Sequence, residues 1–167
     1  SQGRVWIGTR DGLSYYDEEK DQFKNFFYEK KGKRQQVNGI AEISPEQLLI
    51  STQEGLIMFD SKESKFVEDA FSTAMHKIIA SALYRHGDII YIGTMEDGLY
   101  SYSVTQKNLE KVTPILDTKR IQAILQQSPT RIWIATEGAG LLLLNPKTKE
   151  LKTYLHSSSD PKSISSN

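Results

Sequence analysis

The chain has no cysteine among its 167 residues. Disulfide bonds and thiolate metal sites are therefore excluded. Its net charge is zero, because 21 lysines and arginines balance 21 aspartates and glutamates. A balanced charge gives no general attraction to nucleic acid or to an anionic membrane surface, so we expect neither as a partner. No apolar run reaches the roughly 18 residues of a membrane-spanning helix, and we expect no membrane contact by this segment.

Signatures of catalysis are also scarce. The sequence supports no Ser-His-Asp arrangement and offers no cysteine nucleophile. Neighbouring carboxylates such as Glu96-Asp97 fall in predicted turns. His76 and His86 lack a second ligand at metal-binding spacing. We therefore expect no catalytic residue, no metal site and no cofactor, and no kinase, phospho-acceptor or DNA-binding motif is present.

What the sequence does contain is one pattern written four times. The first copy is RVWIGTRDGLSYYD, residues 4–17. Its threonine recurs at intervals of 43, 42 and 42 residues, at Thr9, Thr52, Thr94 and Thr136. The glycine that opens its second half recurs at intervals of 43, 43 and 42, at Gly12, Gly55, Gly98 and Gly140. A fixed period over the whole chain indicates a repeat architecture.

Each copy predicts a strand, a tight turn and a second strand. Both halves are apolar at consecutive positions, so we expect both faces of these strands to be buried. A further strand is expected after each second half, around Phe23, Phe66, Leu109 and Leu151, and another before each later copy. Four strands in a period of about 42 residues are typical of a propeller blade. Another type of solenoid is the structural alternative.

The predicted fold class is all-β, a β-propeller fragment of about four blades of four-stranded antiparallel sheet. The chain is expected to form a single propeller segment, with blades at about 4–26, 40–69, 77–112 and 120–154 and a connector at 155–167. The first blade lacks its inner strand, and the basic connector at 27–38 is expected to be a solvated loop, with a ligand or partner contact as the alternative. We expect a piece of a longer propeller, completed by the remaining blades of the same protein, or a homodimer whose two copies close an eight-bladed ring.

The hairpin turns are the best candidates for ligand binding, because loops on a rigid scaffold commonly carry contacts. They should share one rim and they vary between copies, although ordinary solvated turns remain the alternative. The candidate residues are Arg10, Asp11, Gln53, Glu54, Met95, Glu96, Asp97 and Glu137. Trp6 and Trp133 would suit sugar stacking, but they share a repeat position with Leu49 and Tyr91, which favours packing.

The repeated residues resemble the two-component regulator propeller repeat. VWIGTRDGLSYYD in the first copy matches the family pattern closely, and the third copy keeps IGT and DGL. The second and fourth copies carry Ser51 and Ala135 in place of the pattern's glycine. The tail SSSDPKSISSN is similar to the family's connector between blades.

The resemblance implies the periplasmic sensor region of a hybrid two-component receptor from Bacteroides-like bacteria. Its histidine kinase and regulator parts would lie across the membrane, and many such receptors detect oligosaccharides. The expected function is therefore ligand sensing without catalysis, with an oligosaccharide as the ligand. A protein-interaction or dimerisation scaffold, or a propeller enzyme acting on polysaccharide, are the alternatives.

Overall fold

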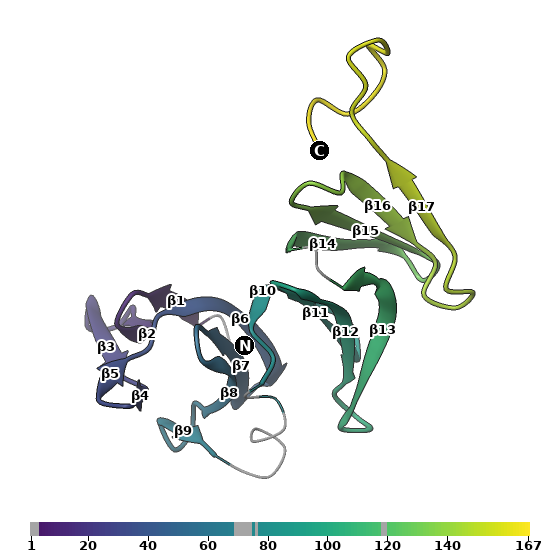
Figure 1. Ribbon diagram of the computed structural model, residues 1–167. Coiled ribbons are helices and arrows are strands. Elements are labelled where there is room, and N and C mark those ends of the chain that lie inside the picture. Colours follow the sequence, from purple (N-terminus) through teal and green to yellow (C-terminus); the bar gives the residue numbers. More distant parts are fainter. Residues whose placement is uncertain (1–3, 69–74, 76, 118–119) are drawn as a thin grey trace. The chain divides into compact units, whose positions relative to one another are not determined.

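The computed structural model describes residues 4–68, 75, 77–117 and 120–167, which form seventeen β-strands. All the paired strands are antiparallel and each sheet is open (Figure 1). Backbone contacts divide the chain into two compact units, residues 1–80 and 81–167. Of the residues singled out from the sequence, His76 and the end of the second predicted blade at 69 lie outside the described ranges. Within those ranges, no helix is long and apolar enough to cross a membrane.

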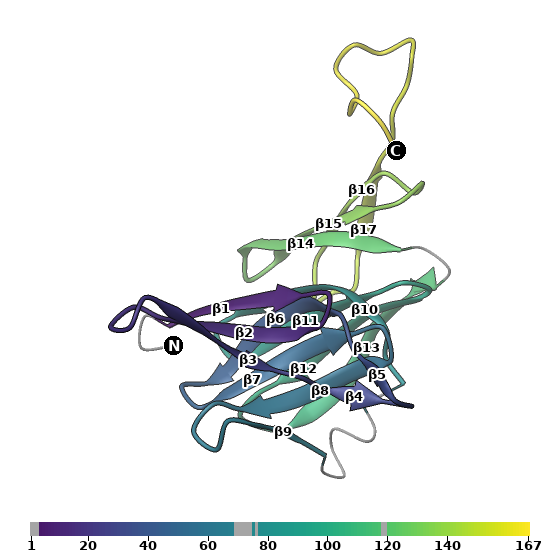
Figure 2. The same ribbon diagram turned by 90° about the vertical axis from the view of Figure 1, so that its left-hand side faces the viewer.

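The first unit contains two sheets of the predicted kind. The first has three strands in the order β1-β2-β3, and the second has four in the order β6-β7-β8-β9 (Figure 2). The strands of the first sheet are β1 (Val5–Thr9), β2 (Gly12–Asp17) and β3 (Gln22–Phe26). Those of the second are β6 (Val37–Ser44), β7 (Gln47–Thr52), β8 (Gly55–Asp60) and β9 (Lys65–Val67).

The second unit contains two four-stranded sheets, ordered β10-β11-β12-β13 and β14-β15-β16-β17. Strand β10 (Ala80–His86) begins at the boundary between the two units. The strands that follow it in the third sheet are β11 (Ile89–Thr94), β12 (Asp97–Ser103) and β13 (Asn108–Asp117). Those of the fourth are β14 (Ile121–Ser128), β15 (Arg131–Thr136), β16 (Leu141–Leu144) and β17 (Leu151–Tyr154). The predicted fold class, with a first blade that lacks its inner strand, is confirmed.

The basic connector is more ordered than the predicted loop. Two short strands, β4 (Glu29–Lys30) and β5 (Lys33–Arg34), form a hairpin within it. Lys31 and Gly32 make its turn with φ angles of 53° and 71°, the left-handed pair that a tight hairpin turn requires. The hairpin is anchored by Tyr28, which is buried and donates a 3.0 Å hydrogen bond to Glu68.

The repeated threonine and glycine have a common structural task. In every copy the threonine hydroxyl donates to the carbonyl of the glycine, at 3.0, 2.8, 2.8 and 2.8 Å along the chain. The same hydroxyl accepts an N–H from inside the turn, at 3.3, 3.2, 2.8 and 3.2 Å. The threonine therefore satisfies backbone groups that the turn leaves unpaired. We call this arrangement the threonine lock.

Glycine is needed in the lock for space as well as conformation. Gly12 and Gly140 have φ angles of 148° and 78°. A Cβ added at Gly12 would stand 2.3 Å from the Phe26 carbonyl oxygen, and one at Gly140 would stand 2.3 Å from that of Tyr154. The outer strand therefore approaches the turn more closely than any side chain allows.

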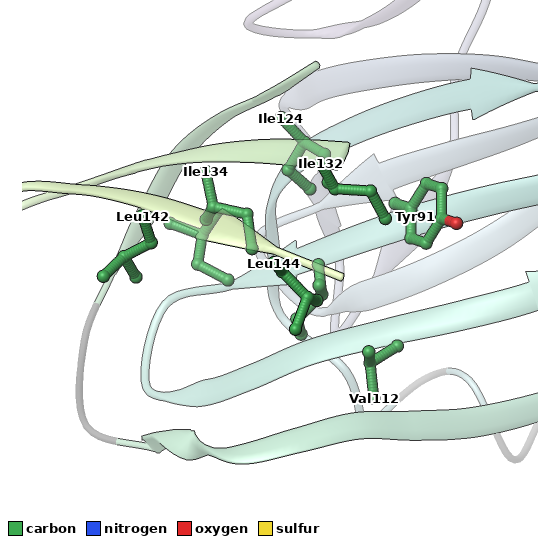
Figure 3. Close-up of a cluster of buried hydrophobic side chains, with 9 residues drawn as sticks. Tyr91, Val112, Ile124, Ile132, Ile134, Leu142 and Leu144 are labelled. Atoms are coloured by element: carbon green, nitrogen blue, oxygen red, sulfur yellow. The ribbon is translucent and has the colours of Figure 1, made fainter. Parts of the chain in front are cut away.

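Each unit has its own hydrophobic core between its two sheets. In the first unit the largest fully buried side chain is Phe59, and Trp6 and Phe26 pack on it with ring centroids 5.4 and 4.9 Å away. In the second unit, Ile132, Ile134, Leu142 and Leu144 of the fourth sheet join Tyr91 of the third (Figure 3). These residues come from alternate strand positions, so one face of the fourth sheet forms this core.

The expectation of burial on both faces is met in individual strands of the middle copies. Strand β8 is buried at every position from Gly55 to Phe59, and β11 from Ile90 to Thr94. In the first copy Val5 and Ile7 are exposed, and in the fourth β16 alternates between half-buried and buried positions. The repeat position shared by the tryptophans behaves as a packing position, because Leu49 and Tyr91 are buried there and Trp6 contacts Phe59.

Candidate functional site

Within each unit the predicted turn residues lie at one end of both sheets. In the first unit Gly8 abuts Val37, where an added Cβ would stand 2.7 Å from Cγ1, and Val37 pairs with Thr52. In the second unit Gly93 abuts Ile121 in the same way, and Ile121 pairs with Thr136. The two threonine locks of a unit therefore stand side by side. The turn residues between them form a rim on each unit.

On the first unit, the rim is made of two turns and the connector hairpin. Gln53 donates a 3.3 Å hydrogen bond to Gln36, and Glu54 lies 3.6 Å from the Lys31 ammonium. Arg10 and Asp11 form the neighbouring turn and are exposed. We call this surface the first-unit rim.

The hairpin side of this rim is cationic. Arg34 lies over the Phe27 ring, 3.8 Å from its centroid, and 3.7 Å from the Glu29 carboxylate. A guanidinium stacked on an exposed ring is held in place without losing its outward donors. The sequence marks the connector that holds Lys31, Arg34 and Gln36 as a possible ligand contact, but these three residues were not among the candidate turn residues. The Lys31-Gly32 dipeptide between two polar pairs is the signal that could have revealed the hairpin.

On the second unit, some rim residues form ion pairs or hydrogen bonds with neighbouring side chains and others do not. The Lys111 ammonium donates a 2.7 Å hydrogen bond to Asp97 and, with the Tyr100 hydroxyl, holds the pKa of that carboxyl below its ordinary value. Glu137 lies 3.7 Å from the Arg120 guanidinium. In the described part of the chain, Met95 and Glu96 are exposed and make no recorded polar contact. Among the described residues of this rim, Met95 and Glu96 are therefore less engaged than Asp97 and Glu137.

The acidic residues of the described chain are scattered and not gathered into one centre. Among the described residues, no group of three or more His, Asp or Glu side chains could hold a metal ion. Glu96 and Asp97 are exposed neighbours on one turn, whereas a carboxylate pair in hydrolysis flanks a cleft. Each rim presents hydrogen-bond donors and acceptors on turns that the threonine locks hold in place.

Comparison with known proteins gives matches in structure alone. No protein-family profile matches the chain, and no curated protein matches it. The chain aligns with two crystal structures of the extracellular domain of BT4673 from B. thetaiotaomicron, with TM-scores of 0.79 and 0.75 and sequence identities of 19% and 20%. BT4673 is called a one-component system in the first structure and a hybrid two-component system in the second. The two structures cover 100% and 98% of this chain. The extracellular domain of the hybrid two-component system BT3049, from the same organism, aligns at 0.66 with 23% identity over 92% of the chain.

The chain has the fold of these extracellular domains. This agrees with the resemblance to the two-component regulator propeller repeat, which is thereby confirmed at the level of fold. The chain spans only 23%, 21% and 22% of the three matched domains. Those domains therefore contain several times as much structure as the four sheets described above.

Proposed function

We propose that this chain is a ligand-sensing propeller segment of a membrane-bound hybrid two-component receptor, on the periplasmic side of the inner membrane. The single observation that carries the proposal is the alignment over the whole chain with the extracellular domain of BT4673. The rims support it, because they present varied side chains on a constant frame of threonine locks. The segment itself binds and does not catalyse.

We further propose that the ligand is an oligosaccharide. A rim that mixes amide, carboxylate and guanidinium groups can pair with the donors and acceptors that every sugar hydroxyl supplies together. Arg10, Gln53 and Glu54 provide this mixture on the first unit, and Glu96 and Glu137 provide the acceptors on the second.

The receptor role is tested in the bacterium that encodes the chain. Deleting the gene should abolish the transcriptional induction of the receptor's target genes during growth on one class of polysaccharide. Returning the intact gene should restore that induction. Complementation with Arg10→Ala or Glu96→Gln should restore less induction than complementation with Lys147→Gln, an exposed change in the β16–β17 turn, which is not one of the rim turns. Unchanged induction on every polysaccharide after deletion would contradict the receptor role.

The exposed apolar faces favour a second role, assembly with further blades. Val5 and Ile7 are 46% and 37% exposed, whereas Leu48 and Ile50 at the corresponding positions of the second sheet are 4% and 0% exposed. On the fourth sheet Leu125 is 56% exposed and stands in register with Trp133. We propose that another blade covers each face, supplied by a second copy of the chain or by other blades of the same receptor.

A further inference from the structure

A polar cleft lies between the two sheets of the first unit, at the end opposite the first-unit rim. It has a volume of about 410 Å³, within the range of roughly 300–1,000 Å³ for small-molecule sites. Strand β1 contributes Arg4 and Trp6, the end of β2 contributes Tyr15 and Asp17, and β3 contributes Lys24. Ser61 and Ser64, in the turn after β8, form the other wall. We call it the Trp6 cleft.

Asp17 sets this cleft apart from the other copies of the repeat. Its counterparts cap the following turn: Asp60 accepts N–H bonds from Lys62 and Glu63 at 2.9 and 2.8 Å, and Asn145 accepts them from Lys147 and Thr148 at 3.1 and 3.4 Å. The backbone turn is the same in the first copy, since Asp21 has a φ of 50° where Ser64 has 55° and Lys149 has 63°.

The Asp17 carboxylate nevertheless makes no such cap. The whole residue is only 8% exposed, and its recorded partners in the described chain are the Lys20 and Lys24 ammoniums at 3.6 and 3.7 Å. Both distances exceed that of a hydrogen bond, so the carboxylate oxygens keep acceptor capacity in a nearly buried position. The two ion pairs compensate the charge of Asp17 but leave its hydrogen-bond acceptor positions open, and a bound donor can fill them.

Aromatic rings line the cleft beside this carboxylate. The Trp6 and Tyr15 ring centroids lie 5.3 Å apart, and Trp6 is fixed from behind by Phe59. Arg4 lies 5.8 Å from the Tyr15 ring centroid, and Lys24 pairs with Tyr15 across the strands. The cleft therefore combines apolar ring surface with a carboxylate acceptor, cationic donors and serine hydroxyls.

The mixture of aromatic, acidic and basic side chains in the Trp6 cleft suits some classes of ligand better than others. A simple anion would meet Asp17, Glu18 and Glu19, and a simple cation would meet Arg4 and Lys24. A sugar ring has apolar C–H faces and an edge of hydroxyls that both donate and accept, so it can use every group in the cleft. Resting on the proposed function, we infer that the Trp6 cleft is a saccharide-binding site, in which Asp17 accepts hydroxyl hydrogen bonds and Trp6 and Tyr15 contact the ring.

The test follows the fluorescence of Trp6 in the full 167-residue chain. The chain has two tryptophans, so Trp133→Phe leaves Trp6 as the single reporter. This variant is titrated with maltose, cellobiose, xylobiose and galactobiose, and with sodium sulfate and arginine hydrochloride as ionic probes. We expect a saturable change with at least one disaccharide. A change with sulfate or arginine alone, or with none of the probes, would overturn the inference.

In the Trp133→Phe background, Asp17→Asn should raise the Kd of the responding disaccharide by roughly tenfold or more, because a hydrogen bond to a charged acceptor is lost. Lys24→Gln should also weaken disaccharide binding, and it replaces Asp17→Asn in the test if that variant does not fold. The matched control is Lys152→Gln, at the corresponding position of the fourth sheet, and it should leave affinity unchanged. A response that survives both cleft changes but is lost in Arg10→Ala would refute the cleft and leave the proposed receptor function standing.

Discussion

Gly93 shows how closely neighbouring sheets approach at the level of a single residue. A Cβ at this position would stand 2.5 Å from Cγ2 of Ile121, a fully buried residue of the next inner strand. We predict that Gly93→Ala lowers the free energy of unfolding by about 1–3 kcal/mol through overpacking, measured by urea titration. The control is Ala135→Ser, a change at the corresponding repeat position that should stay within about 0.5 kcal/mol. Equal stability of Gly93→Ala and the parent chain would refute the close approach.

Asp97 gives a second prediction at this scale, in its pH dependence. Its pKa lies below the unfolded value, so the ionised carboxylate stabilises the fold above that value, and this contribution is lost as the pH falls through the folded pKa. Lys111→Gln should therefore destabilise the chain at pH 7 and have less effect at pH 2. Because Asp97 is largely exposed, the difference should be small.

Chemical denaturation at the two pH values measures this effect. Glu96→Gln is the control, since Glu96 sits on the same turn without a recorded ion pair in the described chain. A penalty for Lys111→Gln that is the same at both pH values would show that the lysine acts through packing.

At the scale of the element, Tyr28 anchors the connector hairpin. Burial, followed by its hydrogen bond to Glu68, raises the pKa of Tyr28 to about 12. A raised phenol pKa stabilises the fold fully below the unfolded value of 10.0, and this contribution is lost as the pH rises towards 12. Tyr28→Phe should cost about 1 kcal/mol at pH 8, and the penalty should shrink above pH 10.

Alkaline denaturation of both chains checks this prediction. Tyr154→Phe, at the end of an outer strand, is the matched control and should leave the alkaline transition unchanged. If Tyr28→Phe lost the same stability at pH 8 and at pH 12, the hydrogen bond to Glu68 would not be what holds the hairpin.

The elements also show where sequence reasoning succeeds and where it stops. The period near 42 predicts the Thr-to-Gly hairpin of each of the four copies, because Thr and Gly at fixed spacing perform a local task that each copy repeats. The β4–β5 hairpin was missed, since Lys30, Lys33 and Arg34 have no apolar strand pattern. Its anchors are the long-range hydrogen bond from Tyr28 to Glu68 and the local stacking of Arg34 on Phe27. The sequence also did not reveal that Asp17 leaves its turn uncapped whereas Asp60 caps its own, because both are aspartates at the same repeat position.

At the scale of the whole molecule, the exposed faces predict association. Light scattering of the chain should give a mass of about twice 19.0 kDa if a second copy covers them. Ile7→Glu and Leu125→Glu place a charge on the first and fourth sheets and should each shift the mass to that of one chain. Met95→Glu, on an exposed turn, is the control. A monomer of the parent chain at all concentrations would contradict the homodimer and favour the remaining blades of the same receptor.

The threonine lock has a consequence for how such a protein changes over generations. The lock uses one hydroxyl, one glycine carbonyl and one turn N–H, so the identity of the intervening side chains plays no part in it. Met95–Asp97 and Glu137–Ala139 both fill a turn of the same length between a threonine and its glycine. Side chains in these turns can therefore change by mutation while the lock itself is kept, provided that the backbone conformation of the turn, such as the positive φ of Gly138, is preserved.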